Sequence, residues 1–373
     1  MATFTLTTGI DTIVAGPGDT VNGTAATLNP GDSLTGTGND ALALYGSGTF
    51  RVDQLAAFSG FSAITLNNFT AGNAILYLGG QSVTVTGAGN QGSELVYLGT
   101  GAVNFIGASY SSIYSFSPSD WTAANTITGP SPYQTYLYLA WDGQANETYD
   151  LTGNTLSKIA QLYSGATGLT VKINSADAAG IAQFYGGGQS QRLTTSDASL
   201  DLSHSSVSGF TVSSTNPFGT TFTVADVGTA FQIAGGSGQD TIVAQGFTFT
   251  ADQRNAIFAT ASIETIIDQS GTYTAPPPNA NVFTLTTGTD TIVAGPGDTV
   301  NGTAVTLNPG DSLTGAGNDT LALWGSGGFQ VDQLATFTGF ESITINNFTT
   351  SGAALYLGSD RGCSPGVSEA CAL

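Results

Sequence analysis

Aspartate residues recur with a 21-residue period in the opening segment of the chain. Asp11 and Asp32 lie 21 positions apart, and so do Asp19 and Asp40. Short apolar runs and glycine-containing turns fill the intervals. Such a period is typical of coils that stack into a solenoid with one or two short strands per coil. The pattern therefore predicts an all-β fold: a parallel β-solenoid, of the β-roll or β-helix kind, with Gly/Asp-rich turns and a few short helices.

A much longer repeat divides the chain. Residues 4–80 recur at 283–359 with a constant offset of 279, and roughly 60 of the 77 positions are identical. Three consecutive prolines precede the second copy, and a Pro-rich joint of this kind is a semi-rigid spacer. The predicted parts are a first unit at 1–271 with a looser middle at 81–230, a linker at 272–282, an incomplete second copy at 283–359, and an unrelated tail at 360–373.

The middle of the chain keeps an alternation of strand-sized apolar runs and glycine- or serine-rich turns. Val83–Val85, Val103–Ile106 and Leu169–Ile173 are examples of these runs. They predict strands, because successive side chains of a strand point to opposite faces. Three stretches of about two turns each are compatible with helices, and they are residues 52–58, 155–162 and 251–258.

Charge is scarce and strongly acidic in this chain. Only 9% of residues are charged, and 26 Asp and Glu against 6 Lys and Arg give a net charge of −20. This balance argues against nucleic acid and anionic membrane surfaces, which require a basic patch, and it favours a cationic partner. No apolar run reaches the roughly 18 residues that a membrane helix needs. The first residues, Met1 to Thr5, do not resemble a cleavable signal peptide.

Cysteine and histidine are too rare to support much of the usual site chemistry. Cys363 and Cys371 both fall in the tail, and His204 is the single histidine. Zinc clusters, thiol catalysis within the fold and a disulfide scaffold are therefore excluded. We expect His204, which lies between two serines, to be a solvated loop residue.

A glycine-rich motif at residues 235–243 suggests metal binding. This segment, Gly-Gly-Ser-Gly-Gln-Asp-Thr-Ile-Val, matches the nonapeptide G-G-x-G-x-D-x-U-x at every specified position. Weaker forms occur at 36–42 and 315–321, and a Gly-Pro-Gly-Asp form occurs at 16–21 and 295–300. Glycines allow the positive φ angles that aim carbonyl oxygens inward, and aspartate adds a hard anionic oxygen. The alternative is that these segments are ordinary solvated turns, since Asp and Gly dominate turns in general.

Electrostatics gives a second argument for a cation. Coils of a solenoid lie about 5 Å apart, and two ionised aspartates at that distance repel by roughly 3 kcal/mol at an effective dielectric of about 20. With few basic residues nearby, a bound divalent ion would relieve this repulsion. We therefore predict Ca²⁺ as the cofactor, because it accepts six to eight oxygen ligands from carboxylates and carbonyls. The candidate ligands are Gly36, Gly38, Asn39, Asp40, Gly236, Gly238, Asp240, Asp11, Asp19, Asp32, Asp290, Asp298, Asp311, Gly317, Asn318 and Asp319.

These motifs resemble a known family. The nonapeptide resembles the RTX repeats of proteins that Gram-negative bacteria export by type I secretion. The larger pattern, from Leu6–Thr12 through Thr27–Leu34 to Gly60–Leu66, resembles RTX-type surface-layer proteins and related large repetitive exoproteins. The resemblance implies calcium-dependent folding, an extracellular or cell-surface location, and a lattice or adhesive role. Nonapeptides in tandem and a C-terminal secretion signal, both usual in that family, are not evident here.

Three functions follow in order of preference. The first is a structural, calcium-stabilised module of a surface layer, matrix or other exoprotein, without enzymatic activity, which self-associates into a lattice or fibre. The second is an adhesin that binds cell-surface glycans, with sugars stacking on the aromatic residues of 110–121 and 133–141. The alternative is that the alternating Tyr and Leu form a half-buried strand whose rings stack along the solenoid. The third is a β-helix polysaccharide lyase or hydrolase, for which the acids are Asp142, Glu147 and Asp150 and the nearby bases are Lys158, Lys172 and Arg192.

Overall fold

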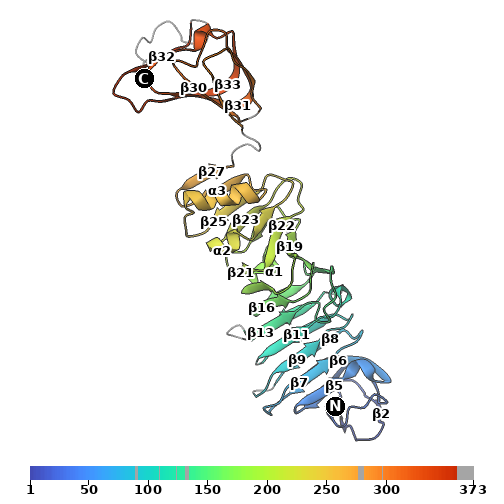
Figure 1. The fold of residues 1–373 in the computed structure, drawn as a ribbon. Helices are drawn as coiled ribbons and strands as arrows, with labels where there is room; N and C mark the ends of the chain where they lie inside the picture. The colour runs from blue at the N-terminus through green and yellow to red at the C-terminus, as the bar shows by residue number, and fades with distance from the viewer. Residues whose placement is uncertain are drawn as a thin grey trace. The chain divides into compact units, whose positions relative to one another are not determined.

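The computed structural model describes residues 1–88, 91–108, 110–122, 124–130, 134–275, 281–295 and 297–358, with only the backbone of Thr260, Gly317 and Asn318. The chain divides into two compact units, Met1–Thr274 and Ala275–Leu373 (Figure 1). Strand content is 48% and helix content 8%. The fold is a parallel β-solenoid of about 15 turns, so the predicted fold class is confirmed. The predicted tail at 360–373 lies outside the described residues.

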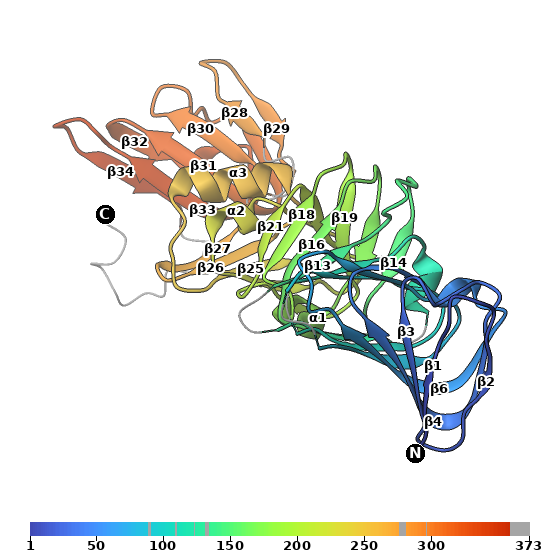
Figure 2. The same cartoon turned by 90° about the horizontal axis from the view of Figure 1, so that it is seen from below.

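The first unit begins with two long parallel sheets that share a core. The nine-stranded sheet consists of β1 (Thr3–Thr5), β2 (Thr12–Val14), β3 (Thr20–Thr24), β4 (Ser33–Tyr45), β6 (Ala57–Asn67), β8 (Val83–Gly87), β10 (Val103–Ile106), β12 (Thr126–Thr128) and β15 (Thr155–Ser157). The eight-stranded sheet consists of β5 (Gly48–Arg51), β7 (Ala74–Tyr77), β9 (Glu94–Tyr97), β11 (Ser111–Tyr114), β13 (Thr135–Tyr138), β16 (Ile159–Ser164), β18 (Gln183–Gly186) and β21 (Ser206–Ser208). Figure 1 shows β5, β7, β9, β11, β13 and β16 stacked along the solenoid, and Figure 2 shows the same unit from below.

Two five-stranded sheets continue the first unit. One contains β14 (Thr148–Asp150), β17 (Thr170–Lys172), β19 (Gln191–Thr195), β22 (Phe210–Ser214) and β24 (Ile233–Gly235). The other contains β20 (Ser199–Asp201), β23 (Thr221–Val224), β25 (Thr241–Ala244), β26 (Thr265–Asp268) and β27 (Gly271–Thr274). All pairs are parallel except β26 with β27, which form an antiparallel hairpin. Residues 272–274 of the predicted linker therefore belong to a strand. The looser middle at 81–230 continues the solenoid that begins at the N-terminus.

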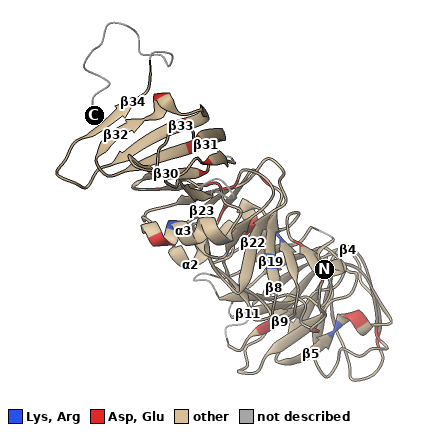
Figure 3. Ribbon diagram, turned by 45° about the horizontal axis from the view of Figure 1, so that its top comes forward, with Lys and Arg blue, Asp and Glu red and all other residues tan. Residues whose placement is uncertain are grey.

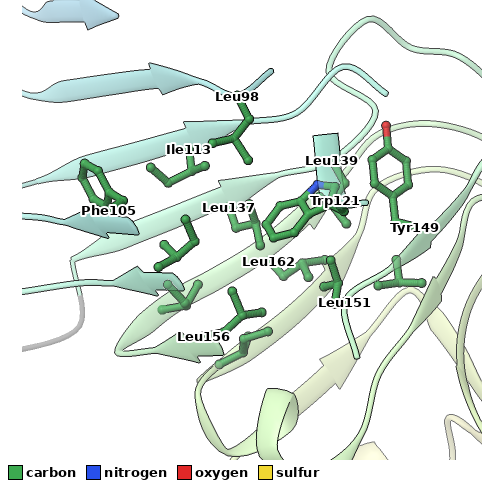
Figure 4. Close-up of a cluster of buried hydrophobic side chains, with 14 of the residues drawn as sticks. Leu98, Phe105, Ile113, Trp121, Leu137, Leu139, Tyr149, Leu151, Leu156 and Leu162 are labelled. Atoms are coloured by element: carbon green, nitrogen blue, oxygen red, sulfur yellow. The ribbon is translucent and has the colours of Figure 1, made fainter. Parts of the chain in front are cut away.

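Alternation of apolar and polar residues builds the core. In β8, Val83 and Val85 point inward, whereas the two threonines between and after them are half-exposed. The inward side chains stack coil upon coil. Figure 4 shows part of this column, in which Phe105, Ile113, Leu137 and Leu162 are fully buried. Apolar burial of this kind supplies the main stabilisation, at about 25 cal/mol per Å² of apolar surface removed from water.

Helices are short, as predicted. They are η1 (Val52–Gln54), η2 (Pro118–Trp121), α1 (Ser175–Ala179), α2 (Val227–Ala230), α3 (Ala251–Thr260) and η3 (Val331–Gln333), where η marks a 3₁₀ turn. The helix expected at 251–258 is confirmed as α3, which Thr250 caps. The helix expected at 155–162 is wrong. Lys158 has a left-handed φ of 55° and divides this segment into β15 and β16. None of the described helices is long and apolar enough to cross a membrane.

The second unit repeats the opening coils of the first. Its five-stranded sheet contains β28 (Val282–Thr284), β29 (Thr291–Val293), β30 (Thr299–Thr303), β31 (Ser312–Trp324) and β33 (Thr336–Asn346), and β32 (Gly327–Gln330) pairs with β34 (Ala353–Tyr356). The pairing matches that of β1 to β7 strand for strand. Its core is a separate cluster that includes Leu313, Leu321 and Phe329.

Candidate metal centre in the stacked aspartate turns

The periodic aspartates of the first unit form two columns between adjacent coils. Oδ1 of Asp32 accepts a hydrogen bond from the backbone N–H of Asp11 at 2.8 Å. Oδ1 of Asp40 accepts one from the N–H of Asp19 at 2.9 Å, and the N–H of Ala2 donates to Asp19. Each of these carboxylates therefore binds the backbone of the preceding coil, and Asp32 and Asp40 do so at the preceding aspartate.

The second oxygen of each carboxylate closes its own turn. Oδ2 accepts from the N–H three residues earlier, which belongs to Gly16 for Asp19 (2.8 Å), to Asn29 for Asp32 (2.8 Å) and to Thr37 for Asp40 (2.5 Å). One side chain thus satisfies two backbone donors that the turn would otherwise bury. Charge-assisted bonds of this kind are stronger than neutral ones.

The second unit reproduces both columns. The N–H of Asp290 donates to Asp311 and the N–H of Asp298 donates to Asp319, each at 2.8 Å. The N–H of Asp319 in turn donates to Oε2 of Glu341 at 2.9 Å. Asp11 and Asp290, at the first position of their column, each accept from the threonine N–H four residues earlier at 2.7 Å. Apart from Glu341, which stands where the first copy has Ser62, the arrangement is thus a property of the repeated sequence.

Amide donors explain how these carboxylates tolerate burial. Asp32, Asp40, Asp311 and Asp319 have no solvent-exposed surface. The hydrogen bond from the Thr37 N–H holds the pKa of Asp40 below its ordinary value in spite of burial, and the N–H of Asn281 does the same for the pKa of Asp298. A carboxylate that accepts two backbone N–H bonds is favoured in its charged form. The donors thus supply stabilisation that the sequence had led us to expect from a cation.

The glycines of these turns have a steric role. A Cβ on Gly60, where φ is +74°, would lie 2.0 Å from the carbonyl oxygen of Gly36 in the neighbouring coil. Gly36 is equally confined, since its own Cβ would lie 2.5 Å from Oδ2 of Asp40. Gly38 adopts φ +110° with open space around it, and Asn39 is exposed. The side chains of the corresponding residues Gly317 and Asn318 lie outside the described part of the chain.

The best nonapeptide match builds a different environment around Asp240. Oδ1 of Asp240 accepts from the N–H of Thr220 at 2.7 Å, and the Asp240 N–H donates to Oε2 of Glu264 at 2.6 Å. Oδ2, however, is buried and has no hydrogen-bond partner among the described residues. The neighbouring coils approach each other closely at this turn, because a Cβ on Gly238 would lie 2.0 Å from the backbone N of Gly219. A Cβ on Gly236 would lie 2.4 Å from the Ser214 carbonyl oxygen.

The two kinds of turn differ in how well they fit calcium. In the periodic columns, backbone N–H groups already occupy the carboxylate oxygens of Asp19, Asp32, Asp40 and their copies, so a cation would have to displace those donors. At Asp240, a buried anionic oxygen lacks a donor and Glu264 brings a second carboxylate close. No group of three or more His, Cys, Asp or Glu side chains suited to a metal occurs among the described residues. Carbonyl oxygens would have to complete a coordination shell at Asp240.

A row of tyrosines runs along the outer face of the eight-stranded sheet. The strand registers align Tyr77, Tyr97, Tyr114, Tyr138, Tyr163 and Tyr185. Ring centroids lie 4.2 Å apart at the first pair and 4.8 Å apart at the third, with nearly parallel planes. Arg51 covers the first ring at 4.2 Å. Burial raises the pKa of Tyr97 to about 12. The rings of Tyr77, Tyr97, Tyr114 and Tyr138 therefore stack face to face, whereas Tyr138 and Tyr163 meet at an interplanar angle of 66°.

Among the acids and bases considered for catalysis, one acid is in contact with one base, and another acid bonds a tyrosine. Asp150 and Lys172 form an ion pair at 3.7 Å with both side chains half-exposed. Glu147 accepts a hydrogen bond from the hydroxyl of Tyr149 at 3.0 Å. Figure 3 shows that the few Lys and Arg residues, drawn in blue, lie at separate places along the ribbon.

Sequence reasoning missed three parts of these arrangements. Glu264 and Glu341 each take the place of an aspartate in a column, but they lie 24 and 22 residues after their donors, outside the 21-residue period. The full extent of the tyrosine row was also missed: ring stacking along the solenoid was expected at 133–141, whereas the row runs from Tyr77 to Tyr185. Its signal was a tyrosine near the end of each strand-sized run, such as Leu76-Tyr77 and Val96-Tyr97.

Comparison with known proteins identifies no relative of this chain. No family model, no curated protein and no solved structure matches the chain. The assignment of the fold therefore rests on the strand pairing of the chain itself, which is that of a parallel β-solenoid.

Proposed function

We propose that this chain is a structural module of a surface layer, extracellular matrix or other large repetitive exoprotein. The observation that carries this proposal is the duplication: the segment 4–80 and its copy at 283–359 build the same coils with the same buried aspartate columns. A sequence repeated in this way extends length and repeats contact surfaces. The module acts outside the cell or on its surface, in line with the RTX resemblance, and it performs no catalysis.

Calcium stabilisation belongs to this proposal at one place, the turn of Asp240. A buried carboxylate oxygen without a donor costs roughly 1–3 kcal/mol or more. A Ca²⁺ ion held by Asp240, Glu264 and turn carbonyls would offset that cost. Because the ion binds the folded turn and not the unfolded chain, its binding free energy would add to stability.

Thermal unfolding with Ca²⁺ and with excess chelator tests the calcium part. We expect Ca²⁺ to raise the melting temperature of the wild-type chain, and Asp240→Asn to remove this response. Asp142→Asn, at an exposed acid outside the turn, is the matched control and should keep it. Identical melting curves with calcium and with chelator would refute calcium binding.

Limited proteolysis tests the structural role. A scaffold module should resist protease with no glycan added, since its apolar core and the hydrogen bonds of its aspartate columns are in place without one. Protection that develops only after a glycan is added would instead favour a binding module.

A second candidate, glycan binding, is supported by Trp141. This ring is 46% exposed and lies beside the tyrosine row, 4.8 Å from Tyr114 and 5.1 Å from Tyr138, with interplanar angles of 62° and 67°. Sugars stack on exposed aromatic faces, and the stacked tyrosines offer few. A glycan array with the wild type and Trp141→Ala tests this candidate. Signals that the substitution abolishes would support an adhesin, and an array without signals would contradict it.

A further inference from the structure

An exposed aromatic ring ends the fourth strand of each copy. Tyr45 is the last residue of β4 and Trp324 is the last residue of β31, and each is 43% exposed. The residues before them, Leu44 and Leu323, are fully buried, so the two rings lie on the outer face of a sheet. Both strands have a paired neighbour on each side, namely β3 and β6 for β4 and β30 and β33 for β31. The rings are therefore exposed within the stack of coils and not at its end.

A hollow of about 240 Å³ lies beside Tyr45, and Asn22, Thr24 and Thr27 are among the residues that line it. The hydroxyl oxygens of the two threonines lie 3.1 Å apart. Asn22 is half-buried, and its side-chain amide forms no hydrogen bond with a described residue. An aromatic ring thus borders polar groups that can donate hydrogen bonds to a ligand and accept them from it.

The second copy repeats the arrangement with a different ring. Nε1 of Trp324 donates a hydrogen bond to Oδ1 of Asn301 at 2.9 Å, so the indole lies against the counterpart of Asn22. The two threonine hydroxyls are again 3.1 Å apart. The ring centroid of Phe348 lies 6.2 Å from that of Trp324, and its counterpart Phe69 is 56% exposed in the first copy. The aromatic surface therefore extends toward the next coil, with an amide and two hydroxyls at its border.

Differences between the two copies spare this site. The polar residues of the hollow and the neighbouring phenylalanine are identical in both copies, and in the first copy they are Thr5, Asn22, Thr24, Thr27 and Phe69. The exchange of Tyr45 for Trp324 retains an aromatic ring. At another exposed position the chemistry changes, because Ser62 corresponds to Glu341. Both copies therefore present the same groups to a ligand.

The site carries no charge, and this identifies the class of ligand. Asp19 and Asp40 stand five residues before Thr24 and Tyr45, roughly 17 Å away along their strands at about 3.4 Å per residue. Nucleic acid bases also stack on aromatic rings, but the phosphates need basic side chains. A cation is attracted to the same ring faces, but no carboxylate among the residues that line the hollow would neutralise it. A neutral sugar offers an apolar face to the ring and hydroxyls to the amide and the threonines.

We propose that each copy binds a neutral polysaccharide, with Tyr45 in the first copy and Trp324 in the second stacking on the face of one sugar ring. The amides of Asn22 and Asn301 bond to hydroxyls of that sugar, and the neighbouring phenylalanine contacts the next sugar of the polymer. The chain therefore has two equivalent sites. This binding goes beyond the structural role proposed above, and it does not involve Trp141.

Retention of the full chain on insoluble polysaccharides is the first test. Cellulose, chitin, β-1,3-glucan and mannan represent neutral polymers, and alginate represents an acidic one. We expect the wild type to be retained on a neutral polymer and not on alginate. The double variant Tyr45→Ala/Trp324→Ala should not be retained. Phe218→Ala, at an 89% exposed ring outside both sites, is the matched control and should be retained like the wild type. Circular dichroism of each variant shows that it is folded.

Calorimetric titration with a soluble oligosaccharide of the retained polymer counts the sites. The wild type should bind two oligosaccharides per chain. Tyr45→Ala and Trp324→Ala should each bind one, because truncation of a central aromatic contact weakens the altered site by roughly 30-fold or more. Trp324→Tyr gives the second copy the ring that the first copy has, so this variant should keep both sites.

Three results would overturn the proposal. They are a wild type that no neutral polymer retains, retention that the double variant keeps, and a single oligosaccharide per wild-type chain. Binding that Trp141→Ala abolishes and the double variant keeps would place the sugar beside the tyrosine row, which also contradicts the proposal. Each of these outcomes leaves the structural role standing, since resistance to protease without a glycan is measured independently.

Discussion

The aspartate columns make a specific prediction for Asp32→Asn. Asp32 is fully buried, and its two oxygens accept the N–H groups of Asp11 and Asn29, each at 2.8 Å. Asparagine keeps one oxygen that can accept a hydrogen bond. Its NH₂ group is a donor, so it cannot accept a hydrogen bond from the other backbone N–H. One charge-assisted bond, which contributes about 1.5–3 kcal/mol, is lost. The remaining bond becomes a neutral one of about 1 kcal/mol. We therefore expect this coil to lose about 2–5 kcal/mol of stability against local opening.

Hydrogen–deuterium exchange measures this loss directly. Each 1.36 kcal/mol is a factor of ten, so the amides of Asp11 and Asn29 should exchange about 30- to 5,000-fold faster in the variant. The same molecule contains the control: the amides of Asp290 and Asn308 donate to Asp311 at the same distances, and they should not change. Peptides from the two copies are distinguishable, because Ile10 corresponds to Thr289.

Two results would refute the reasoning. Exchange at Asp11 that remains equal to exchange at Asp290 would mean that the carboxylate does not hold the neighbouring coil. Wild-type amides that exchange at the variant's rate once calcium is chelated would mean that a cation, and not the pair of N–H donors, holds the column together.

Three further perturbations test other parts of the fold. Leu162→Ala removes a fully buried side chain and should cost about 2–5 kcal/mol in denaturant unfolding; a loss below about 1 kcal/mol would contradict the packed core. Gly60→Ala should destabilise the chain far more than Gly246→Ala, because both glycines have positive φ but only the Cβ at Gly60 would meet a neighbouring coil; equal effects would show that φ strain alone matters. Burial raises the pKa of Asp177 to about 6, so the folded state favours its protonated form, ionisation costs stability above pH 6, and this cost disappears as the pH falls to about 4. Asp177→Asn should therefore raise the melting temperature at pH 8 and leave it unchanged near pH 3.5, and an equal shift at both pH values would count against this assignment.

Much of the fold was predictable from periodicity. The 21-residue spacing of Asp11 and Asp32 sets the length of a coil, and the alternation in segments such as Val83–Val85 sets which side chains face inward. The segment 155–162 was misread because Leu156, Ile159 and Leu162 have helix-like spacing. The left-handed backbone at Lys158, which the sequence does not signal, places all three in strands on the inward side.

The candidate site was predictable only in part. The sequence identified which aspartates stack, but a stack of carboxylates is compatible with a shared cation or with shared backbone donors. Whether a cation or backbone donors stabilise the stack depends on where the N–H groups point. The direction of the N–H groups follows from the offset between coils and not from residue type. Asp240 illustrates the point, since its motif is the closest to the metal-binding pattern and its Oδ2 lacks the donor that Asp40 has.

The columns also have a direction. Apart from Asp11 and Asp290, each carboxylate of a column accepts from the coil that precedes it, with donor and acceptor 17 to 24 residues apart. During synthesis from the N-terminus, the backbone N–H donors are therefore made before the carboxylates that accept their hydrogen bonds. Each coil that carries such a carboxylate can form this hydrogen bond to the preceding coil as soon as it is synthesised, and residues made later are not required. In this order, the turns that are made first serve as a template for the later ones. If the chain were made from its C-terminus, the carboxylate acceptors would be present before their N–H donors.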